Sequence, residues 1–373
     1  MCVILTFDCD GILSAAIAQK VWGGRVVFQK WHKFAVDAED VALIRSLKPK
    51  VVAVTDLGAE EESLGLLSGL AAEGVKVWVF DNHPPEDLST VASYAGENFH
   101  IVTSSANCSA GLLYDAVKDA LEDYGEWAKT WAALAIYGDV MTDAEQGKPM
   151  YDAILAENPV LSSKILRWGK GEDGKFATQE SDMVARLSGY FNTPRRIARH
   201  YGAYTALQMA REIEKAGDVT LPEQGFGRRE EALYPATFMV KKWRQEWYDR
   251  WTDVFKAENM RFWDLGDFTF SVVSHEWNVG TQVANIKAGD KERSKPHLCL
   301  NLCPFDGYVT IGARKPKEGS SLHLGKVLNR AGELSGGVLK GGGLSMAASA
   351  HAPAGITVSE VVNLLVRAVK EVV

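Results

Sequence analysis

The sequence lacks long apolar runs, cysteine pairs and an excess of positive charge, and each absence argues against a class of protein. No stretch of its 373 residues approaches the roughly 18 uninterrupted apolar residues that a membrane-spanning helix needs, so no membrane partner is expected. The five cysteines are scattered without a CxxC pair, which argues against a disulfide framework and a structural zinc site. The net charge of −7 gives no sign of a strongly basic nucleic-acid-binding protein, although a local basic groove can coexist with an acidic remainder.

The first residues and the scattered thiols predict a cytoplasmic location. Met1 is followed by a short apolar run that reaches Asp8 with no basic segment before it, unlike a secretory signal peptide. Unpaired cysteines suit a reducing compartment. The sequence leaves the oligomeric state, monomer or homo-oligomer, open.

What is present predicts two globular domains. A hydrophobic content of 46% and a charged content of 24% are typical of soluble proteins, and the length exceeds that of one ordinary core. We expect a first α/β domain over residues 1–195, a helical connection over 196–235 and a smaller α/β domain over 236–373.

Short apolar runs alternate with helical patterns in the first part, which favours a parallel α/β sheet. The predicted strands are residues 3–7, 25–28, 51–55 and 75–80, and the predicted helices are residues 12–21, 110–121 and 127–137. The region from about 150 to 235 is predicted to be mostly helical, with a polar glycine-containing loop at 169–174.

The last part of the chain changes from helix to strands. Trp243, Trp247 and Trp251 recur at a spacing of four residues, which indicates a packed helix face rather than a base-stacking platform. The predicted strands that follow are residues 268–273, 298–302 and 308–311, with a final helix over 358–369.

Acidic side chains follow several predicted elements where a parallel sheet places its ligands. Asp8 and Asp10 follow the first strand, Asp56 the third, Asp81 the fourth, and Asp139 an apolar helix. Ligands of open parallel sheets bind beyond the carboxyl ends of the strands. Because several carboxylates at one edge repel each other, a hard divalent cation among them is the natural compensation.

Helix capping is the alternative interpretation of these aspartates. Asp10 before Gly11, and Asp56 before the acidic helix start at Glu60, suit a cap as well as a metal site. Four such positions at one sheet edge favour metal. Two cations sharing a carboxylate would hold a phosphate and generate hydroxide near neutral pH, and His83 would bind or protonate that phosphate.

These residues, in this order, resemble the motifs of the DHH phosphoesterase superfamily, which includes RecJ-type exonucleases and nanoRNase-like phosphodiesterases. Residues 6–11, Thr-Phe-Asp-Cys-Asp-Gly, are similar to the first motif, His-x-Asp-x-Asp-Gly. Asp56 matches the second motif, residues 81–83 (Asp-Asn-His) match the Asp-His-His motif, and Asp139 matches the Gly-Asp of the fourth. The resemblance implies Asp8, Asp10, Asp56, Asn82 and Asp139 as metal ligands, and Asp81 and His83 as catalytic residues.

The second domain resembles the accompanying DHHA1 domain, which faces the first across a cleft. Gly341, Gly342 and Gly343 begin a segment similar to the glycine-rich DHHA1 loop, and Arg314 stands where that domain has a substrate-binding arginine. Three successive glycines expose backbone N–H groups to phosphate oxygens, although a flexible turn explains them equally. The resemblance implies that these four residues bind substrate.

Three positions depart from the family pattern. Thr6 and Asn82 replace histidines that bind one metal each, and Leu344 replaces a histidine of the second-domain loop. An asparagine carbonyl and water molecules are workable Mg²⁺ ligands, whereas Mn²⁺ loses more when imidazoles are missing.

The resemblance implies a metal-dependent phosphodiesterase or exonuclease-type hydrolase that uses Mg²⁺ or Mn²⁺, with two ions. Its expected substrates are short oligonucleotides, single-stranded nucleic-acid ends or other phosphorylated small molecules. Two alternatives stay open: an exopolyphosphatase-like phosphatase, and a non-catalytic binding or scaffold protein that keeps the fold. The retained aspartates and His83 favour the enzyme.

Overall fold

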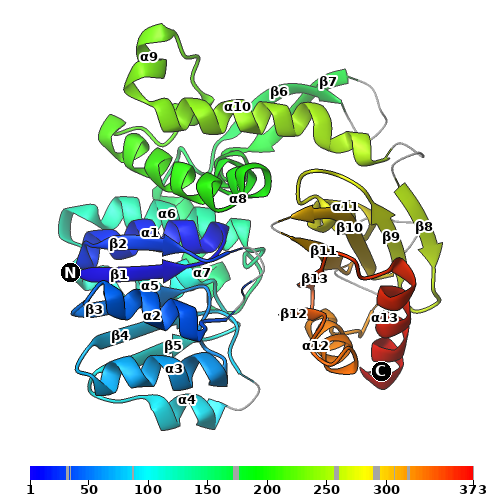
Figure 1. The fold of residues 1–373 in the computed structure, drawn as a ribbon. Coiled ribbons are helices and arrows are strands. Elements are labelled where there is room, and N and C mark those ends of the chain that lie inside the picture. The colour runs from blue at the N-terminus through cyan, green and yellow to red at the C-terminus, as the bar shows by residue number, and fades with distance from the viewer. Residues whose placement is uncertain are drawn as a thin grey trace. The chain divides into compact units, whose positions relative to one another are not determined.

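The chain divides into two units, which are described separately. The computed structural model describes residues 1–30, 33, 35–85, 88–170, 176–255, 260–288, 295–305, 307–316 and 320–372. Unit 1 comprises Met1–Gln245 and unit 2 comprises Glu246–Val373 (Figure 1). The division falls within one helix, α10. The predicted helical connection over 196–235 stays a prediction.

Unit 1 is built on a parallel five-stranded sheet with the order β2-β1-β3-β4-β5 (Figure 1). Its strands are β1 (Cys2–Thr6), β2 (Arg25–Phe28), β3 (Val51–Thr55), β4 (Lys76–Asp81) and β5 (Phe99–Thr103). The apolar, β-branched composition of these segments suits strands that are buried on both faces. The α/β class and the four predicted strands are confirmed, whereas β5 was missed.

Helices pack on both faces of this sheet. The helices of unit 1 before the hairpin are α1 (Cys9–Trp22), α2 (Ala38–Ser46), α3 (Glu61–Ala72), α4 (Leu88–Tyr94), α5 (Ser109–Val117), α6 (Gly125–Gly138) and α7 (Gly147–Glu157). Apolar side chains of α2 and α3 form one buried cluster with alternate residues of β1, β3 and β4. Helices α1 and α5 contact the strands as well as each other and α6.

The region from 150 to 235 is less helical than the sequence predicts. An antiparallel hairpin, β6 (Lys164–Lys170) and β7 (Phe176–Asp182), precedes α8 (Met183–Ala216). The predicted glycine loop at 169–174 overlaps the end of β6, and its residues 171–174 lie outside the described residues. Helices α9 (Arg228–Leu233) and α10 (Pro235–Arg250) follow.

Helix α8 is sharply bent near its single proline. A Cβ atom on Gly202 would clash with the carbonyl oxygen of Pro194. In a straight helix these residues would be about 12 Å apart along the axis. A proline inside a helix removes one hydrogen bond and permits such a bend, and Gly202 supplies the space for it.

Unit 2 contains a six-stranded mixed sheet with the order β12-β13-β11-β10-β9-β8. Its elements are β8 (Met260–Asp264), β9 (Thr269–Val273), α11 (Gly280–Ala288), β10 (His297–Phe305), β11 (Tyr308–Arg314), α12 (Leu324–Leu334), β12 (Lys340–Gly343), β13 (Ala347–Pro353) and α13 (Val358–Val372). Strands β9 and β10 are parallel, and the other neighbouring pairs are antiparallel. A smaller second α/β unit is thereby confirmed, while β8 and β13 were missed.

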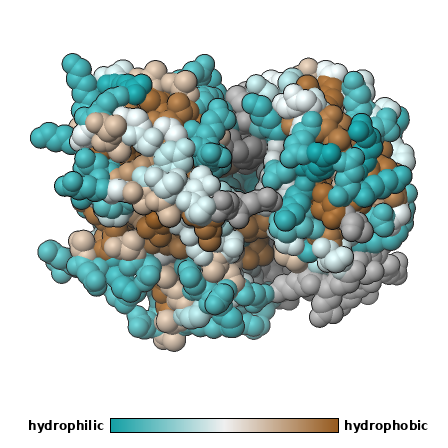
Figure 2. Space-filling model, turned by 90° about the horizontal axis from the view of Figure 1, so that it is seen from below, coloured by the Kyte–Doolittle hydropathy of each residue, from teal (hydrophilic) through white to brown (hydrophobic). Residues whose placement is uncertain are grey.

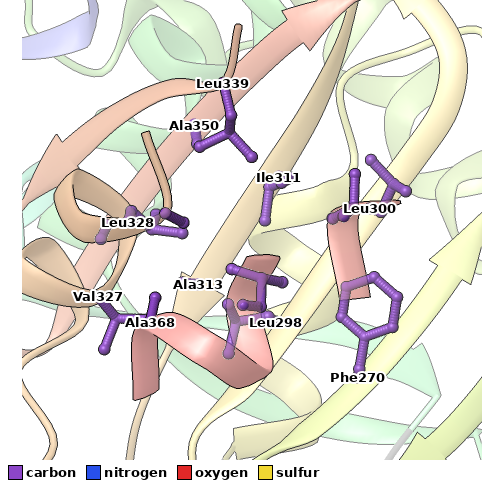
Figure 3. Close-up of a cluster of buried hydrophobic side chains, with 14 of the residues drawn as sticks. Phe270, Leu298, Leu300, Ile311, Ala313, Val327, Leu328, Leu339, Ala350 and Ala368 are labelled. Carbon is purple, nitrogen blue, oxygen red and sulfur yellow. The ribbon is translucent and has the colours of Figure 1, made fainter. Parts of the chain in front are cut away.

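The core of unit 2 lies between this sheet and helices α12 and α13. In Figure 3 the side chains of Leu298, Ile311 and Ala313 from the strands point toward Val327 of α12 and Ala368 of α13. Both helices bury one apolar stripe and expose the opposite, charged side. Of the two, only the final helix was predicted from the sequence.

The three successive glycines form part of a strand rather than a loop, so the predicted glycine loop is wrong in this respect. Gly341, Gly342 and Gly343 pair with Ala350, Ser349 and Ala348 of β13. A Cβ atom on Gly341 would clash with the Cβ of Ala350, so close packing in the sheet already explains one of the glycines. The turn that follows, residues 344–346, connects β12 to β13.

The surface is mixed in polarity. On the face drawn in Figure 2, hydrophilic residues are interspersed with smaller hydrophobic areas. Among the described residues, no helix is both long enough and apolar enough to cross a membrane. All five cysteines are free thiols.

Candidate active site

The sheet order of unit 1 creates a site between β1 and β3. The chain runs from β1 to β2 on one side and then returns past β1 to β3 on the other, and such a reversal leaves a crevice at the carboxyl ends of β1 and β3. Asp8 lies just beyond the end of β1, and Asp56 lies just beyond the end of β3. The two strands are in register up to Thr6 and Thr55, whose hydroxyls are hydrogen-bonded at 2.7 Å.

Asp8 and Asp56 are directly linked. The backbone N–H of Asp8 donates to Oδ2 of Asp56 at 3.1 Å, and the N–H of Asp10 donates to Oδ1 of Asp8 at 3.1 Å. Asp8 is therefore the N-cap of α1, so the capping interpretation holds for this aspartate. Asp56 has φ of 63°, a left-handed conformation that turns its side chain into the crevice end of the sheet at a conformational cost.

Asp10 is held at the N-terminus of α5. Its Oδ2 accepts the N–H of Ser109 at 2.7 Å, and its Oδ1 accepts the N–H of Ala110 at 2.9 Å. Both carboxylate oxygens are thus engaged by the first turn of a helix, where the dipole favours negative charge. Burial nevertheless raises the pKa of Asp10 to about 6, opposed by these amides and assisted by the charge of Asp8.

Asn82 connects β4 to the end of α6. Its side-chain nitrogen donates to Oδ2 of Asp139 at 2.7 Å, while its side-chain oxygen accepts the hydroxyl of Ser109 at 2.8 Å. In this assignment the amide nitrogen faces the aspartates and the amide oxygen faces Ser109. For Asn82 to act as the predicted metal ligand, its amide group would have to turn.

Asp81 and His83 form a pair. Oδ1 of Asp81 accepts from the backbone N–H of His83 at 3.1 Å and contacts Nδ1 of its ring at 2.9 Å, while Oδ2 accepts the N–H of Ala59 at 3.0 Å. Partial desolvation lowers the pKa of His83, but the hydrogen bond and charge of Asp81, with smaller contributions from Asp139 and Asp8, raise it to about 9. The His83 side chain is 47% exposed, so its ring is available to solvent.

The aspartates share one electrostatic environment. Burial, followed by the charges of Asp8, Asp10 and Asp139, raises the pKa of Asp56 well above its usual range. Asp56 is only 6% exposed. The structure therefore brings together the predicted ligands from four separate segments, and the surroundings of Asp56 disfavour the charged form of its carboxyl group.

The oxygen donors of the cluster are of the type that hard cations prefer, but the described residues do not form a ready-made metal site. No group of three or more His, Cys, Asp or Glu side chains among the described residues is arranged so that it could hold a metal ion as it stands. Asp10 and Asn82 are engaged elsewhere, whereas the backbone amides described above occupy one oxygen each of Asp8 and Asp56. Mg²⁺ commonly binds through one or two carboxylates and keeps several water ligands. Asp8 and Asp56 could supply the two carboxylates.

Sequence reasoning missed the residues that hold this cluster in place. Ser109 contacts both Asp10 and Asn82, and Ala110 contacts Asp10. The small residues 109–111 at a helix start were the available signal, because such residues leave helix N-terminal amides open to an anion. Glu60 was noted only as part of a helix start, yet burial and the charge of Asp81 raise its pKa to about 7.

In unit 2 the predicted substrate residues lie on neighbouring strands. Arg314 is the last residue of β11 and pairs with Ala347 of β13, and its Nη1 donates to the backbone carbonyl of Ala313 at 2.8 Å. Nζ of Lys315 donates to the carbonyl of Leu322 at 3.0 Å and to the hydroxyl of Ser345 at 2.9 Å. The substrate-binding role of Arg314 and of residues 341–343 stays a prediction.

Solved structures match this fold over the whole chain, although no protein-family model and no curated protein matches the sequence. A DHH-domain protein described as a member of the s1p family of ribosomal proteins has a TM-score of 0.66 and 14% identity, covering 100% of this chain and 87% of that one. Exonuclease RecJ bound to manganese has a TM-score of 0.57 and 17% identity, covering 100% and 89%. CDC45 from Entamoeba histolytica has a TM-score of 0.53 and 8% identity, covering 99% and 95%.

Identities this low establish the fold alone. They agree with the parallel sheet of unit 1 and the mixed sheet of unit 2. The chain has the two-unit α/β fold of DHH-domain proteins.

Proposed function

We propose that this protein is a divalent-metal-dependent phosphoesterase that hydrolyses phosphodiester bonds of short oligonucleotides or single-stranded nucleic-acid ends. The observation that carries the proposal is Asp56, which is buried and accepts the backbone N–H of Asp8 at 3.1 Å. Burial, followed by the charges of neighbouring aspartates, raises its pKa. Buried like charges are costly without a counter-ion, and a cation at this point would relieve that cost. The manganese-bound RecJ exonuclease of similar fold supports the choice of chemistry.

Asp8 and Asp56 would hold Mg²⁺ or Mn²⁺ at the carboxyl ends of β1 and β3. A bound ion of this kind polarises a phosphoryl oxygen and lowers the pKa of its water ligand. Asp139 adds negative charge at the same point and is itself restrained by Asn82.

His83 would act on the substrate phosphate. With its Nδ1 fixed by Asp81 and a pKa of about 9, the ring is protonated at neutral pH. A protonated imidazole can donate to a phosphate oxygen or to a leaving group from its other nitrogen. Arg314 in unit 2 is the proposed second anchor for a phosphate, because guanidinium binds phosphate in a bidentate manner.

One observation favours a second candidate, a non-catalytic binding or scaffold protein. Asn82 donates to Asp139, and the α5 amides donate to Asp10, so two of the carboxylates are stabilised without any ion. These contacts occupy the place where the resemblance implies a second metal. An exopolyphosphatase-like activity requires the same metal chemistry as the first proposal and differs only in substrate.

A hydrolysis screen tests the proposal. Short RNA, short DNA, nucleotides and polyphosphate are incubated with the full chain in Mg²⁺, in Mn²⁺ and in EDTA. We expect metal-dependent cleavage of an oligonucleotide, its loss in Asp56→Asn, and unchanged turnover in Asp119→Asn, an exposed aspartate of the same unit. Cleavage of polyphosphate alone would establish the phosphatase alternative, and no cleavage of any substrate would favour the scaffold.

A further inference from the structure

A pocket lies in unit 1, away from the aspartate cluster. It has a volume of about 570 Å³ and is lined by residues from α1, α8 and the start of α6. The α1 residues that line it include Lys20, which follows Asp10 by ten positions, or about 15 Å along the helix. Its volume is within the range of small-molecule sites, roughly 300–1,000 Å³.

A buried hydrogen-bond network forms one wall of this pocket. Oε1 of Glu214 accepts the hydroxyl of Tyr124 at 2.5 Å and the indole N–H of Trp131 at 3.1 Å. Oε2 of Glu214 pairs with Nζ of Lys20 at 2.9 Å, and the Glu214 side chain is 10% exposed. The single acidic side chain of the lining is therefore neutralised within the protein wall.

The remaining cations of the lining have no acidic partner in the described structure. Arg211 donates to two neutral amide oxygens, those of Gln19 at 2.6 Å and Gln208 at 3.1 Å. Among the described residues, no ion pair involves Lys215 or Arg211. Lysines in the last turns of α1 and α8 complement the helix dipoles, but the guanidinium of Arg211 lies a full turn earlier and is not explained in this way.

An aromatic ring completes the pocket. Trp127 is half-buried, and its indole stacks on that of Trp131 with ring centroids 5.5 Å apart. The indole N–H of Trp131 donates to Glu214 and to Tyr124, so the ring on which Trp127 stacks is held in a fixed orientation. An indole beside two unneutralised cations suits a ligand with a planar ring and a negative charge.

We propose that this pocket binds a nucleoside phosphate, with the phosphate at Arg211 and Lys215 and the base against Trp127. Two cations gathered in a protein of net charge −7 form a local positive region that attracts such an anion. Binding there needs no divalent metal, since the carboxylate of the pocket is already paired. The pocket would bind its ligand whether or not the aspartate cluster is catalytic.

The test uses ADP and inorganic phosphate as probes, titrated into the full chain in EDTA by calorimetry and tryptophan fluorescence. We expect ADP to bind more tightly than phosphate and to quench Trp127, a signal absent from Trp127→Phe. The double variant Arg211→Gln/Lys215→Gln should lose at least about tenfold in ADP affinity. The matched control Arg228→Gln/Arg229→Gln, with the same charge change on exposed residues of α9, should bind as the wild type does.

Several results would overturn the proposal. They are the absence of ADP binding at millimolar concentration, equal affinity for ADP and phosphate, and an unchanged ADP affinity in Arg211→Gln/Lys215→Gln. Circular dichroism and thermal unfolding establish that each variant is folded. Loss of ADP binding in Arg314→Gln, with retention in the α8 double variant, would locate the nucleotide elsewhere and count against this pocket.

Discussion

The side-chain amide of Asn82 donates a hydrogen bond of 2.7 Å to Oδ2 of Asp139. The DHH resemblance implies a metal-binding imidazole at the position of Asn82, so a neutral donor takes the place of a ligand. The amide stabilises the Asp139 carboxylate directly and reduces the need for a second cation. In the proposed function this contact favours one hydrated ion at Asp8 and Asp56 over two.

Replacing Asn82 with aspartate should destabilise the metal-free protein. Asn82 is fully buried, and a carboxylate there would lose the hydrogen bond and face Asp139 with like charge. An unpaired buried charge costs about 3–5 kcal/mol. The free energy of unfolding is measured in urea with EDTA. Added Mg²⁺ should restore more stability to Asn82→Asp than to the wild type. The exposed control Asn98→Asp should change little, and equal losses in both variants would contradict the buried contact.

Asp56 should make the metal-free protein less stable as pH rises. Its pKa is raised in the folded state above the ordinary value of 3.8, so between these two values the folded state holds the extra proton. The contribution of Asp56 to stability is then complete below a pH of about 4. It is lost as pH rises through the raised pKa, at about 1.4 kcal/mol for each tenfold fall in proton concentration between the two values. In EDTA, Asp56→Asn should lack this fall, and the measurement is thermal unfolding from pH 4 to 8. Parallel pH profiles of wild type and Asp56→Asn would refute the raised pKa.

Restoring the family histidine at Thr6 should not restore a metal site. The Thr6 hydroxyl fills the space where a Cβ on Gly11 would be, and it is hydrogen-bonded to Thr55. A larger ring in this filled space should cost about 1–3 kcal/mol of stability, whereas Thr6→Ser keeps the hydroxyl and should cost less. Urea unfolding and Mn²⁺ binding are measured together. A Thr6→His protein of wild-type stability with tighter Mn²⁺ binding would show that the space is adaptable.

Arg314→Gln should raise KM for an oligonucleotide substrate with little effect on Mn²⁺ affinity. The residue lies at the end of β11 in unit 2, whereas the aspartates belong to unit 1. Losing a charge-assisted phosphate contact should cost about tenfold in kcat/KM. Arg367→Gln, an exposed arginine of the same unit, is the control. An equal loss of metal affinity would contradict a role confined to the substrate.

The strands that carry the aspartates could be predicted from the sequence, because their apolar runs are short and end in polar residues. Asp8 and Asp56 follow such runs, so their place at the sheet edge could be predicted from the strand pattern alone. Strand β5 was missed because its residues 99–103 include a histidine and a threonine, which weaken the apolar pattern.

The details of the site could not be predicted, since they depend on contacts between distant segments. The Asp10 carboxylate accepts hydrogen bonds from Ser109 and Ala110, about 100 residues away in the chain. The local sequence around Asp10 does not predict these hydrogen bonds. The glycines 341–343 suggested a phosphate loop, yet cross-strand packing against Ala350 requires a small residue there. A glycine pattern alone does not separate these two causes.

Direct titration with Mn²⁺, followed by the electron paramagnetic resonance signal of the free ion, tests whether Asp8 and Asp56 hold a hard cation. We predict about one ion bound per chain, displaced by Mg²⁺, with binding lost in Asp56→Asn and in Asp8→Asn and retained in Asp119→Asn. The absence of bound Mn²⁺ at millimolar supply, or unchanged binding in Asp56→Asn, would contradict this prediction.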